Sequence, residues 1–193
     1  MAATLKLHTF ALSHFSEKAR WLLDASGADY VEETWVPFLH VAKALSKGGR
    51  GATTVPVLDT GEGCVQDSTR ILLWLEEHHR PFVLLPTDPA LREEVLAIED
   101  RFDRVGNIVI RYAYSVALGN AETVTALWTI GAKPWQTRVV RTAFPLMRLV
   151  ARKKFKLDQP AAIASAEQKF GVGLDWIAEQ VKDGREFLVG DRL

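Results

Sequence analysis

Two serines lie at the beginning of a predicted helix, in the segment Ser13-His14-Phe15-Ser16. A serine in this position usually caps the helix, because its side-chain oxygen accepts a hydrogen bond from a free backbone N–H group. The same place has unpaired N–H groups and the positive end of the helix dipole, which together favour an anion. The segment therefore predicts either a simple helix cap or a hydroxyl that helps to bind an anion.

A proline stands at the mouth of a predicted strand, in Thr54-Val55-Pro56-Val57. Proline is disfavoured inside a buried strand unless it begins the strand or lies at an edge. A cis Val55–Pro56 bond would turn the N–H and C=O of Val55 outward, where they can pair with an extended, peptide-like ligand. An ordinary edge proline is the alternative, since only about 5% of X–Pro bonds are cis.

A third feature, Gln66-Asp67-Ser68, precedes another predicted helix. Asp67 or Ser68 can simply cap that helix. A helix N-terminus with a hydroxyl can also bind a carboxylate, and a neighbouring aspartate can bind an ammonium group. These groups together would recognise the zwitterionic end of an amino acid.

Apolar spacing predicts the elements that position these three features. Residues 5–10 alternate apolar and polar side chains with the two-residue period of a strand. From Phe15 to Leu23 the apolar residues recur at the spacing of one helical face, and Gly27 follows as a stop signal. The other elements predicted in this half are strands over 30–36, 53–58 and 64–65 and helices over 38–45 and 68–78.

After residue 90 the pattern is helical only. Asp88-Pro89 is a typical helix start, with a capping aspartate before a proline at the first helical position. Further helices are predicted over 121–130, 135–154 and 163–181. We therefore predict an α/β domain over 1–81, a linker over 82–87 and an all-helical domain over 88–193.

Composition narrows the class of protein. The 193 residues include 24 Lys and Arg against 24 Asp and Glu, and a single cysteine. Zero formal charge gives no support for binding nucleic acid or an anionic membrane surface, and one cysteine excludes a disulfide framework and a cysteine-rich zinc site. There is no signal-peptide core and no apolar stretch of about 20 residues. We expect a soluble cytoplasmic protein with no metal.

The three motifs, together with Phe187-Leu188-Val189-Gly190-Asp191-Arg192, resemble those of the glutathione transferase superfamily. The resemblance covers essentially the whole chain and is best in residues 4–80. It implies a thioredoxin-like N-terminal domain, an all-helical C-terminal domain, a homodimer and a role in detoxification. In this family the last motif leads into a further buried helix, so the resemblance implies that the helical domain is either truncated after Leu193 or lacks that element.

The resemblance also implies roles for the motif residues. Ser13 takes the catalytic position, where a hydroxyl donates a hydrogen bond to the sulfur of glutathione, and Ser16 is the alternative. The Val55–Pro56 bond is implied to be cis. Thiol-transferase chemistry is not expected, because no cysteine stands at the start of the first helix. The glutathione contacts implied are Val55 and Pro56 for the cysteinyl backbone, Asp67 and Ser68 for the γ-glutamyl group, and His40 for the glycyl carboxylate.

The second half offers fewer signals. Arg111, Tyr112 and Tyr114, late in the long helix, are candidates for the wall of an electrophile pocket, and packing in the core is their alternative role. The segment 133–156 is basic, since Thr123–Leu157 holds eight Lys or Arg and no Asp or Glu. It either attracts anions or is a solvated helix face.

The sequence thus predicts an enzyme whose partners are glutathione, as co-substrate, and a small electrophile. The thiolate of glutathione would attack the electrophile by substitution, addition or isomerisation. The alternative is a non-catalytic relative that uses the same fold to bind a ligand or a protein.

Overall fold

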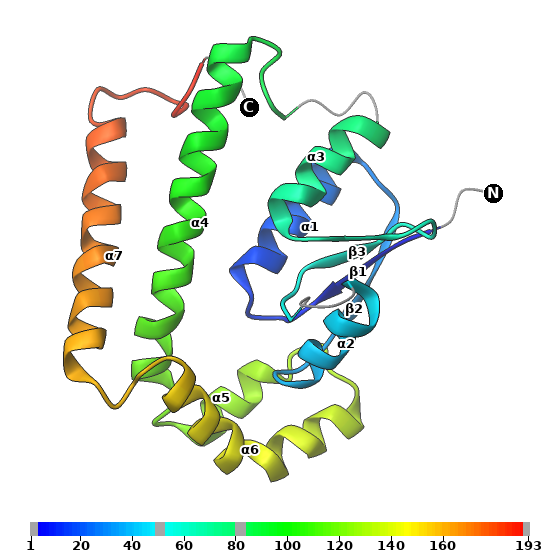
Figure 1. Ribbon diagram of the computed structural model, residues 1–193, viewed down its shortest axis with the longest axis vertical. Helices are drawn as coiled ribbons and strands as arrows, with labels where there is room; N and C mark the ends of the chain where they lie inside the picture. Colours follow the sequence, from blue (N-terminus) through cyan, green and yellow to red (C-terminus); the bar gives the residue numbers. More distant parts are fainter. Residues whose placement is uncertain (1–3, 49–52, 80–83, 191–193) are drawn as a thin grey trace. The chain divides into compact units, whose positions relative to one another are not determined.

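The computed structural model describes residues 4–48, 53–79 and 84–190 (Figure 1). By internal packing the chain forms two compact units. The first unit contains Met1–Val83 and Asn120–Met147, and the second contains Leu84–Gly119 and Arg148–Leu193. The elements of the described residues run β-α-β-α-β-β-α and then four helices, which confirms the predicted fold class. The domain limits predicted from the sequence, 1–81 and 88–193, stay a prediction.

A four-stranded mixed sheet forms the centre of the first unit (Figure 1). Its strand order is β2-β1-β3-β4, with β1 parallel to β2 and antiparallel to β3, and β3 antiparallel to β4. The β3 strand begins one residue after Pro56, which has no N–H group to donate to the sheet. The strands are β1 (Leu5–Thr9), β2 (Tyr30–Thr34), β3 (Val57–Asp59) and β4 (Cys64–Gln66).

The two faces of this sheet bear different helices, because successive side chains of a strand point to opposite sides. On one face α1 (His14–Ser26) and α3 (Ser68–His78) pack against each other. On the other face lies α2 (Leu39–Gly48), which contacts β3 and β4. The core between the sheet, α1 and α3 consists of fully buried apolar side chains, among them Leu7, Ala19, Leu23, Leu58, Ile71 and Leu75.

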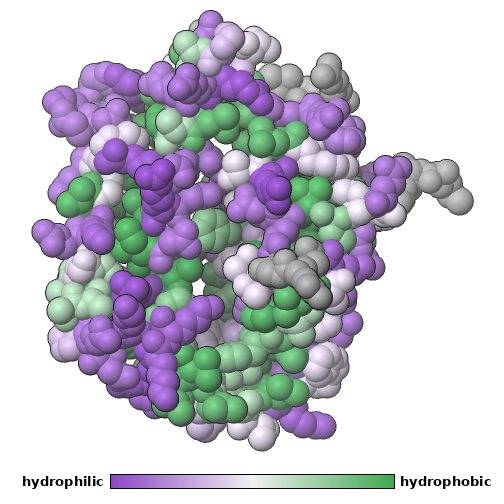
Figure 2. All heavy atoms as spheres, viewed as in Figure 1, coloured by the Kyte–Doolittle hydropathy of each residue, from purple (hydrophilic) through white to green (hydrophobic). Residues whose placement is uncertain are grey.

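The first unit also includes α5 (Ala121–Trp128) and the beginning of α6 (Pro134–Lys154). The rings of Trp128 and Phe144 lie 5.8 Å apart and join these two helices. Figure 2 shows hydrophobic side chains gathered at the lower end of the visible face, over α5 and α6. The exposed apolar residues of α6 are Trp135, Val139, Leu146, Leu149 and Val150.

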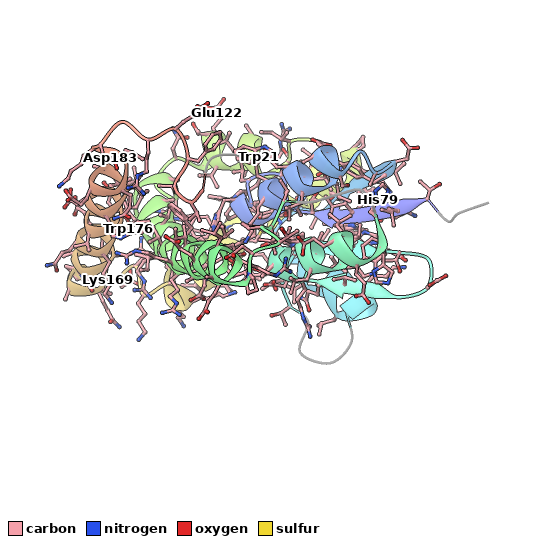
Figure 3. The ribbon with its side chains drawn as sticks, turned by 90° about the horizontal axis from the view of Figure 1, so that it is seen from above. Trp21, His79, Glu122, Lys169, Trp176 and Asp183 are labelled. Carbon is pink, nitrogen blue, oxygen red and sulfur yellow. The ribbon has the colours of Figure 1, made fainter. Side chains whose placement is uncertain are left out.

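The second unit is built on two long helices, α4 (Pro89–Ala117) and α7 (Pro160–Val181), which lie side by side. The side chain of Asp88 caps α4, and Pro89 is its first residue, as the sequence predicts. The ring of Trp176, labelled in Figure 3, meets Phe102 edge to face at 6.0 Å. Within the described ranges, no helix combines the length and the apolar character that crossing a membrane requires.

Candidate functional site

The first part of the site is the start of α1, where Ser13 is the N-cap. Its backbone is extended, with φ −78° and ψ 114°, and its N–H donates to the carbonyl of Phe10 at 2.9 Å. The Ser13 side-chain oxygen accepts a hydrogen bond from the N–H of Ser16 at 3.2 Å. A serine hydroxyl has one donor hydrogen and two acceptor lone pairs, so capping leaves the Ser13 O–H free to donate.

Ser16 has a different environment. Ser16 is 0% exposed, and its side-chain oxygen accepts a hydrogen bond from the N–H of Phe10 at 3.4 Å. Ser13 is only half-buried. The structure therefore favours Ser13 over Ser16 as the hydroxyl that a ligand can reach, and the catalytic role of either serine stays a prediction.

The second part is the loop before β3. The Val55–Pro56 bond is cis, as predicted. Among the described residues, the N–H and C=O of Val55 have no hydrogen-bond partner. The Gln66 amide donates to the carbonyl of Thr54 at 2.7 Å and fixes the loop against β4. The loop therefore holds the main chain of Val55 in place, while its N–H and C=O have no hydrogen-bond partner in the described part of the chain.

The third part is the start of α3, where Asp67 is the N-cap. Its side chain accepts from the N–H groups of Thr69 at 3.0 Å and Arg70 at 3.2 Å. Its own N–H donates to the carbonyl of Pro56 at 3.2 Å, which joins this helix start to the loop of Val55. The φ of Asp67 is +88°, a conformation that costs a non-glycine residue on the order of 1–3 kcal/mol and that is concentrated at functional sites.

Ser68, the first residue of α3, has a buried hydroxyl. The residue is 1% exposed, and its side-chain oxygen has no hydrogen-bond partner among the described residues. A buried polar group that is left unpaired costs about 1–3 kcal/mol, and such groups are rare in folded proteins. An unpaired hydroxyl at a helix N-terminus fits an anionic ligand group such as a carboxylate.

His40 lies in the first turn of α2, half-buried. Its ring stacks on the ring of Phe10 at 6.0 Å. Because the backbone of Phe10 is hydrogen-bonded to Ser13, this stacking brings the start of α2 to the end of β1, beside the start of α1. A contact of His40 with the glycyl carboxylate of glutathione stays a prediction.

The three candidates for an electrophile pocket lie on α4 in the second unit, where each contacts Phe155 or Phe170. Arg111 donates to the carbonyl of Phe155 at 2.9 Å, and the ring of Tyr114 meets the ring of Phe155 at 4.9 Å. Burial raises the pKa of Tyr114. The ring of Tyr112 stacks on Phe170 at 6.4 Å. Their role toward an electrophile stays a prediction.

A charged cluster between α2 and the sheet was not predicted from the sequence. The Nδ1 atom of His8, a residue 1% exposed, lies 3.1 Å from the carboxylate of Glu33 without an aligned hydrogen bond. The ammonium groups of Lys43 and Lys133 lie 3.4 and 3.8 Å from the same carboxylate. Burial, and then the charge of Lys43, lowers the pKa of His8. Burial would raise the pKa of Glu33, but the nearby positive charges, Lys43 first, lower it.

The single thiol of the chain, Cys64 on β4, lies outside this arrangement of helix starts. Burial raises its pKa, which disfavours the reactive thiolate. In the described part of the chain, no three His, Cys, Asp or Glu side chains are grouped so that they could hold a metal ion.

Comparisons with known proteins bear on this geometry. Residues 7–82 match the sequence model of a family described as glutathione S-transferase, N-terminal domain. No curated protein sequence gives a significant match.

Solved structures show the same fold. The β-etherase LigF from Sphingobium sp. strain SYK-6 is 21% identical with a TM-score of 0.72, over 98% of this chain and 77% of that chain. A glutathione S-transferase from Methylobacterium radiotolerans in complex with glutathione sulfonate is 23% identical with a TM-score of 0.55, over 99% and 73%. The glutathione transferase GSTFuA3 from Phanerochaete chrysosporium is 17% identical with a TM-score of 0.63, over 100% and 80%.

The family match covers the sheet and the helix starts described above, and the fold likeness extends over the helices that follow. Residues 7–82 therefore match a glutathione S-transferase N-terminal domain, and the chain as a whole has the fold of these solved structures.

Proposed function

We propose that this protein is a glutathione transferase that activates the thiol of glutathione for attack on a small electrophile. The observation that carries the proposal is a set of polar groups that have no partner among the described residues, in the loop and helix start that the Asp67–Pro56 hydrogen bond joins. These are the main-chain N–H and C=O of Val55 and the buried hydroxyl of Ser68. A peptide with a free amino-acid end can satisfy all of them.

Glutathione matches these groups along its length. Its cysteinyl backbone would pair with Val55, and its γ-glutamyl carboxylate would accept from Ser68 at the N-terminus of α3. The γ-glutamyl ammonium would pair with the carboxylate of Asp67. His40 would face the glycyl carboxylate. Each pairing unites a donor with an acceptor, and those at the charged ends are charge-assisted.

The chemistry follows from the position of Ser13. A free thiol has a pKa of about 8.5, so only a few per cent is thiolate at neutral pH. A hydrogen bond from Ser13 and the dipole of α1 would stabilise the thiolate and lower that pKa. The thiol proton passes to solvent, and the sulfur forms a bond to an electrophilic carbon. In a substitution the leaving group departs with the electron pair of the bond that breaks.

Arg111, Tyr112 and Tyr114 are proposed to contact the electrophile, with the protein acting as a homodimer in the cytoplasm. The chemistry of the electrophile is open to direct test. Because the β-etherase LigF has the same fold, a β-ether is a suitable second test substrate beside a generic aryl halide. The second candidate function, a non-catalytic binding protein, predicts glutathione or protein binding without turnover.

The test is retention on immobilised glutathione combined with turnover of chlorodinitrobenzene and of a β-ether. We expect retention, elution by free glutathione, and turnover of at least one electrophile. Retention without turnover would favour the binding protein, and no retention would refute the glutathione site.

The matched variants for this test are Asp67→Ala and Asp88→Ala, because both aspartates cap a helix through two N–H groups. Only Asp67 belongs to the proposed site. Its loss should weaken glutathione binding on the order of 1–3 kcal/mol, while Asp88→Ala should leave the affinity unchanged.

A further inference from the structure

Basic side chains from three separate segments of the first unit lie close to the carboxylate of Glu33. His8 belongs to β1, Lys43 belongs to α2, and Lys133 precedes α6. The Glu33 side chain is three-quarters buried, at 25% exposed. A carboxylate that is shared in this way acts as a common anchor for the elements around it.

The helix that depends most on this anchor is α2. Among its described side chains only that of Ala44 is buried, and Leu45 is 42% exposed. Within the described residues, two ion pairs connect α2 to the sheet, Lys43 with Glu33 and Lys47 with Asp59. Segments with few buried apolar contacts open locally at a low cost in free energy. Polar links therefore contribute an unusually large share of the docking of α2.

Lys43 is itself well positioned for this role. Its ammonium lies 5.0 Å from the centre of the Trp35 ring, in addition to its contact with Glu33. The ring of Trp35 in turn meets Trp135 edge to face at 6.5 Å. The Glu33 cluster thus links α2 with the beginning of α6 within the same unit.

The position of α2 matters because it carries His40, whose ring stacks on Phe10 beside the start of α1. We propose that Glu33 is a positioning residue that holds α2 against the sheet and thereby keeps His40 in place for the glycyl end of glutathione. The statement about glutathione rests on the proposed function. The statement about α2 rests on the ion pairs alone.

The neighbouring Glu32 provides a matched control. It points to the opposite face of the sheet, where it pairs with Arg20 of α1 at 2.8 Å. The variants Glu33→Gln and Glu32→Gln therefore remove one carboxylate each, from adjacent positions of the same strand. Only the first touches α2.

The direct test is hydrogen exchange of the α2 amides in the whole protein without glutathione. We expect exchange over residues 39–47 to rise about fivefold in Glu33→Gln, and to stay at the wild-type rate in Glu32→Gln and throughout α3. Lys43→Met removes the same ion pair from the other side and should give the same local increase. Unchanged α2 exchange in both Glu33→Gln and Lys43→Met, or an equal increase throughout the unit, would overturn the proposal.

A second measurement separates positioning from general damage. In turnover assays Glu33→Gln should raise the KM for glutathione several-fold and leave kcat within about twofold, because Ser13 is held by α1 rather than by α2. A fall in kcat with an unchanged KM would contradict the assignment. If the wild type neither binds nor uses glutathione, the proposed function fails, while the exchange experiment still decides the role of Glu33.

Discussion

The N–H of Ser16 donates to the side-chain oxygen of Ser13 at 3.2 Å, so the two hydroxyls at the start of α1 have separate roles. Ser13 caps the helix and keeps its own O–H free. Ser16 is buried, and its oxygen accepts from the N–H of Phe10. The bond ties the reachable hydroxyl to the first turn of the helix, where the dipole favours a negative charge.

Replacing Ser13 should therefore change the thiol chemistry. In Ser13→Ala we expect the pKa of bound glutathione to rise toward its free value of about 8.5 and turnover at neutral pH to fall about tenfold or more. The glutathione affinity should change little, since Val55, Asp67 and Ser68 remain. The measurement is the thiolate absorbance of bound glutathione, titrated with pH.

Two variants control for the loss of the helix cap, which by itself costs about 0.5–2 kcal/mol. Ser13→Thr retains a hydroxyl and a cap, so it should keep most of the activity. Ser16→Ala should lower stability but leave the thiol pKa unchanged. A raised thiol pKa in Ser16→Ala alone would reverse the assignment, and no shift in either alanine variant would refute the serine mechanism.

Ser68 offers a prediction in which stability and binding change differently. Its hydroxyl is buried and has no hydrogen-bond partner among the described residues, so Ser68→Ala should leave the free energy of unfolding unchanged or slightly higher. Glutathione binding should nevertheless weaken, on the order of 1 kcal/mol or more. Urea unfolding and calorimetric titration measure the two effects.

Ser16→Ala is the matched comparison, because Ser16 is equally buried but its oxygen is hydrogen-bonded. That variant should be destabilised. If Ser68→Ala is destabilised to the same degree and binds glutathione normally, the hydroxyl of Ser68 is structural rather than a ligand group.

The sequence predicted the elements of the N-terminal α/β part well where the signal is local. The strand at 5–10 is found at Leu5–Thr9, and the helix caps at Ser13 and Asp67 depend on residue types and short spacing. The start of α2 was predicted one residue early. Phe38 has a φ of +68°, a conformation rarely adopted by an aromatic residue that no local pattern indicates.

Contacts set by tertiary pairing could not be predicted in this way. The proximity of His8 and Glu33 follows from the parallel register of β1 and β2, which aligns these two residues. The alternation of side chains along each strand does not by itself show that His8 and Glu33 lie on the same face of the sheet, the face of α2. That follows only from the register of the two strands. Arg111 meets the carbonyl of Phe155 through packing of distant helices, which periodicity along one helix does not reveal.

The buried His8 predicts how stability depends on pH. Burial, and then the positive charges of Lys43 and Lys47, lower the pKa of His8 below the ordinary 6.5. The negative charges of Glu33 and Asp59 raise it, but by less. At a pH between the lowered pKa of His8 in the folded protein and its ordinary pKa in the unfolded chain, the unfolded chain binds more protons than the folded chain. The contribution of His8 to stability is therefore lost as pH falls below 6.5 toward the folded pKa.

The test compares wild type and His8→Gln by urea unfolding at about pH 7.5 and about pH 5.5. The decrease in unfolding free energy between the two pH values should be smaller in the variant. Carboxylates such as Glu32 have a lowered pKa and titrate below this range, so they do not obscure the comparison. An equal decrease in both proteins would contradict the assignment to His8.

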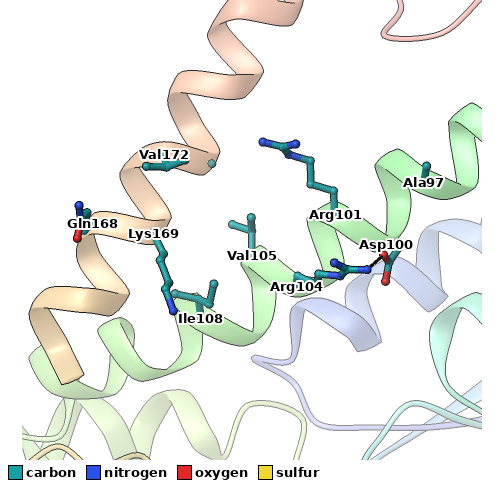
Figure 4. A pocket seen from close by; sticks show the side chains of 10 residues that line it. Ala97, Asp100, Arg101, Arg104, Val105, Ile108, Gln168, Lys169 and Val172 are labelled. Carbon is teal, nitrogen blue, oxygen red and sulfur yellow. Dashed lines mark hydrogen bonds and ion pairs between the residues drawn. The ribbon is translucent and has the colours of Figure 1, made fainter.

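The last prediction concerns the close approach of α4 and α7 in the second unit. A Cβ atom at Gly173 would lie 3.1 Å from the Cγ2 atom of Val105, whereas one at Gly171 would meet nothing within 4 Å. Both glycines lie in α7, and Val105 and Gly173 line a surface pocket between the two helices (Figure 4). The same substitution at the two positions therefore separates steric overlap from helix propensity.

Gly173→Leu should destabilise the second unit by about 1–3 kcal/mol, because the added side chain forces the two helices apart. Gly171→Leu should be neutral or stabilising by up to about 1 kcal/mol, since leucine favours helix more than glycine does. Urea unfolding followed by circular dichroism measures both. Val105→Ala should restore part of the stability of Gly173→Leu, because it removes the methyl groups that the new side chain meets. If the two leucine variants are equally stable, the contact between Gly173 and Val105 does not set the helix spacing.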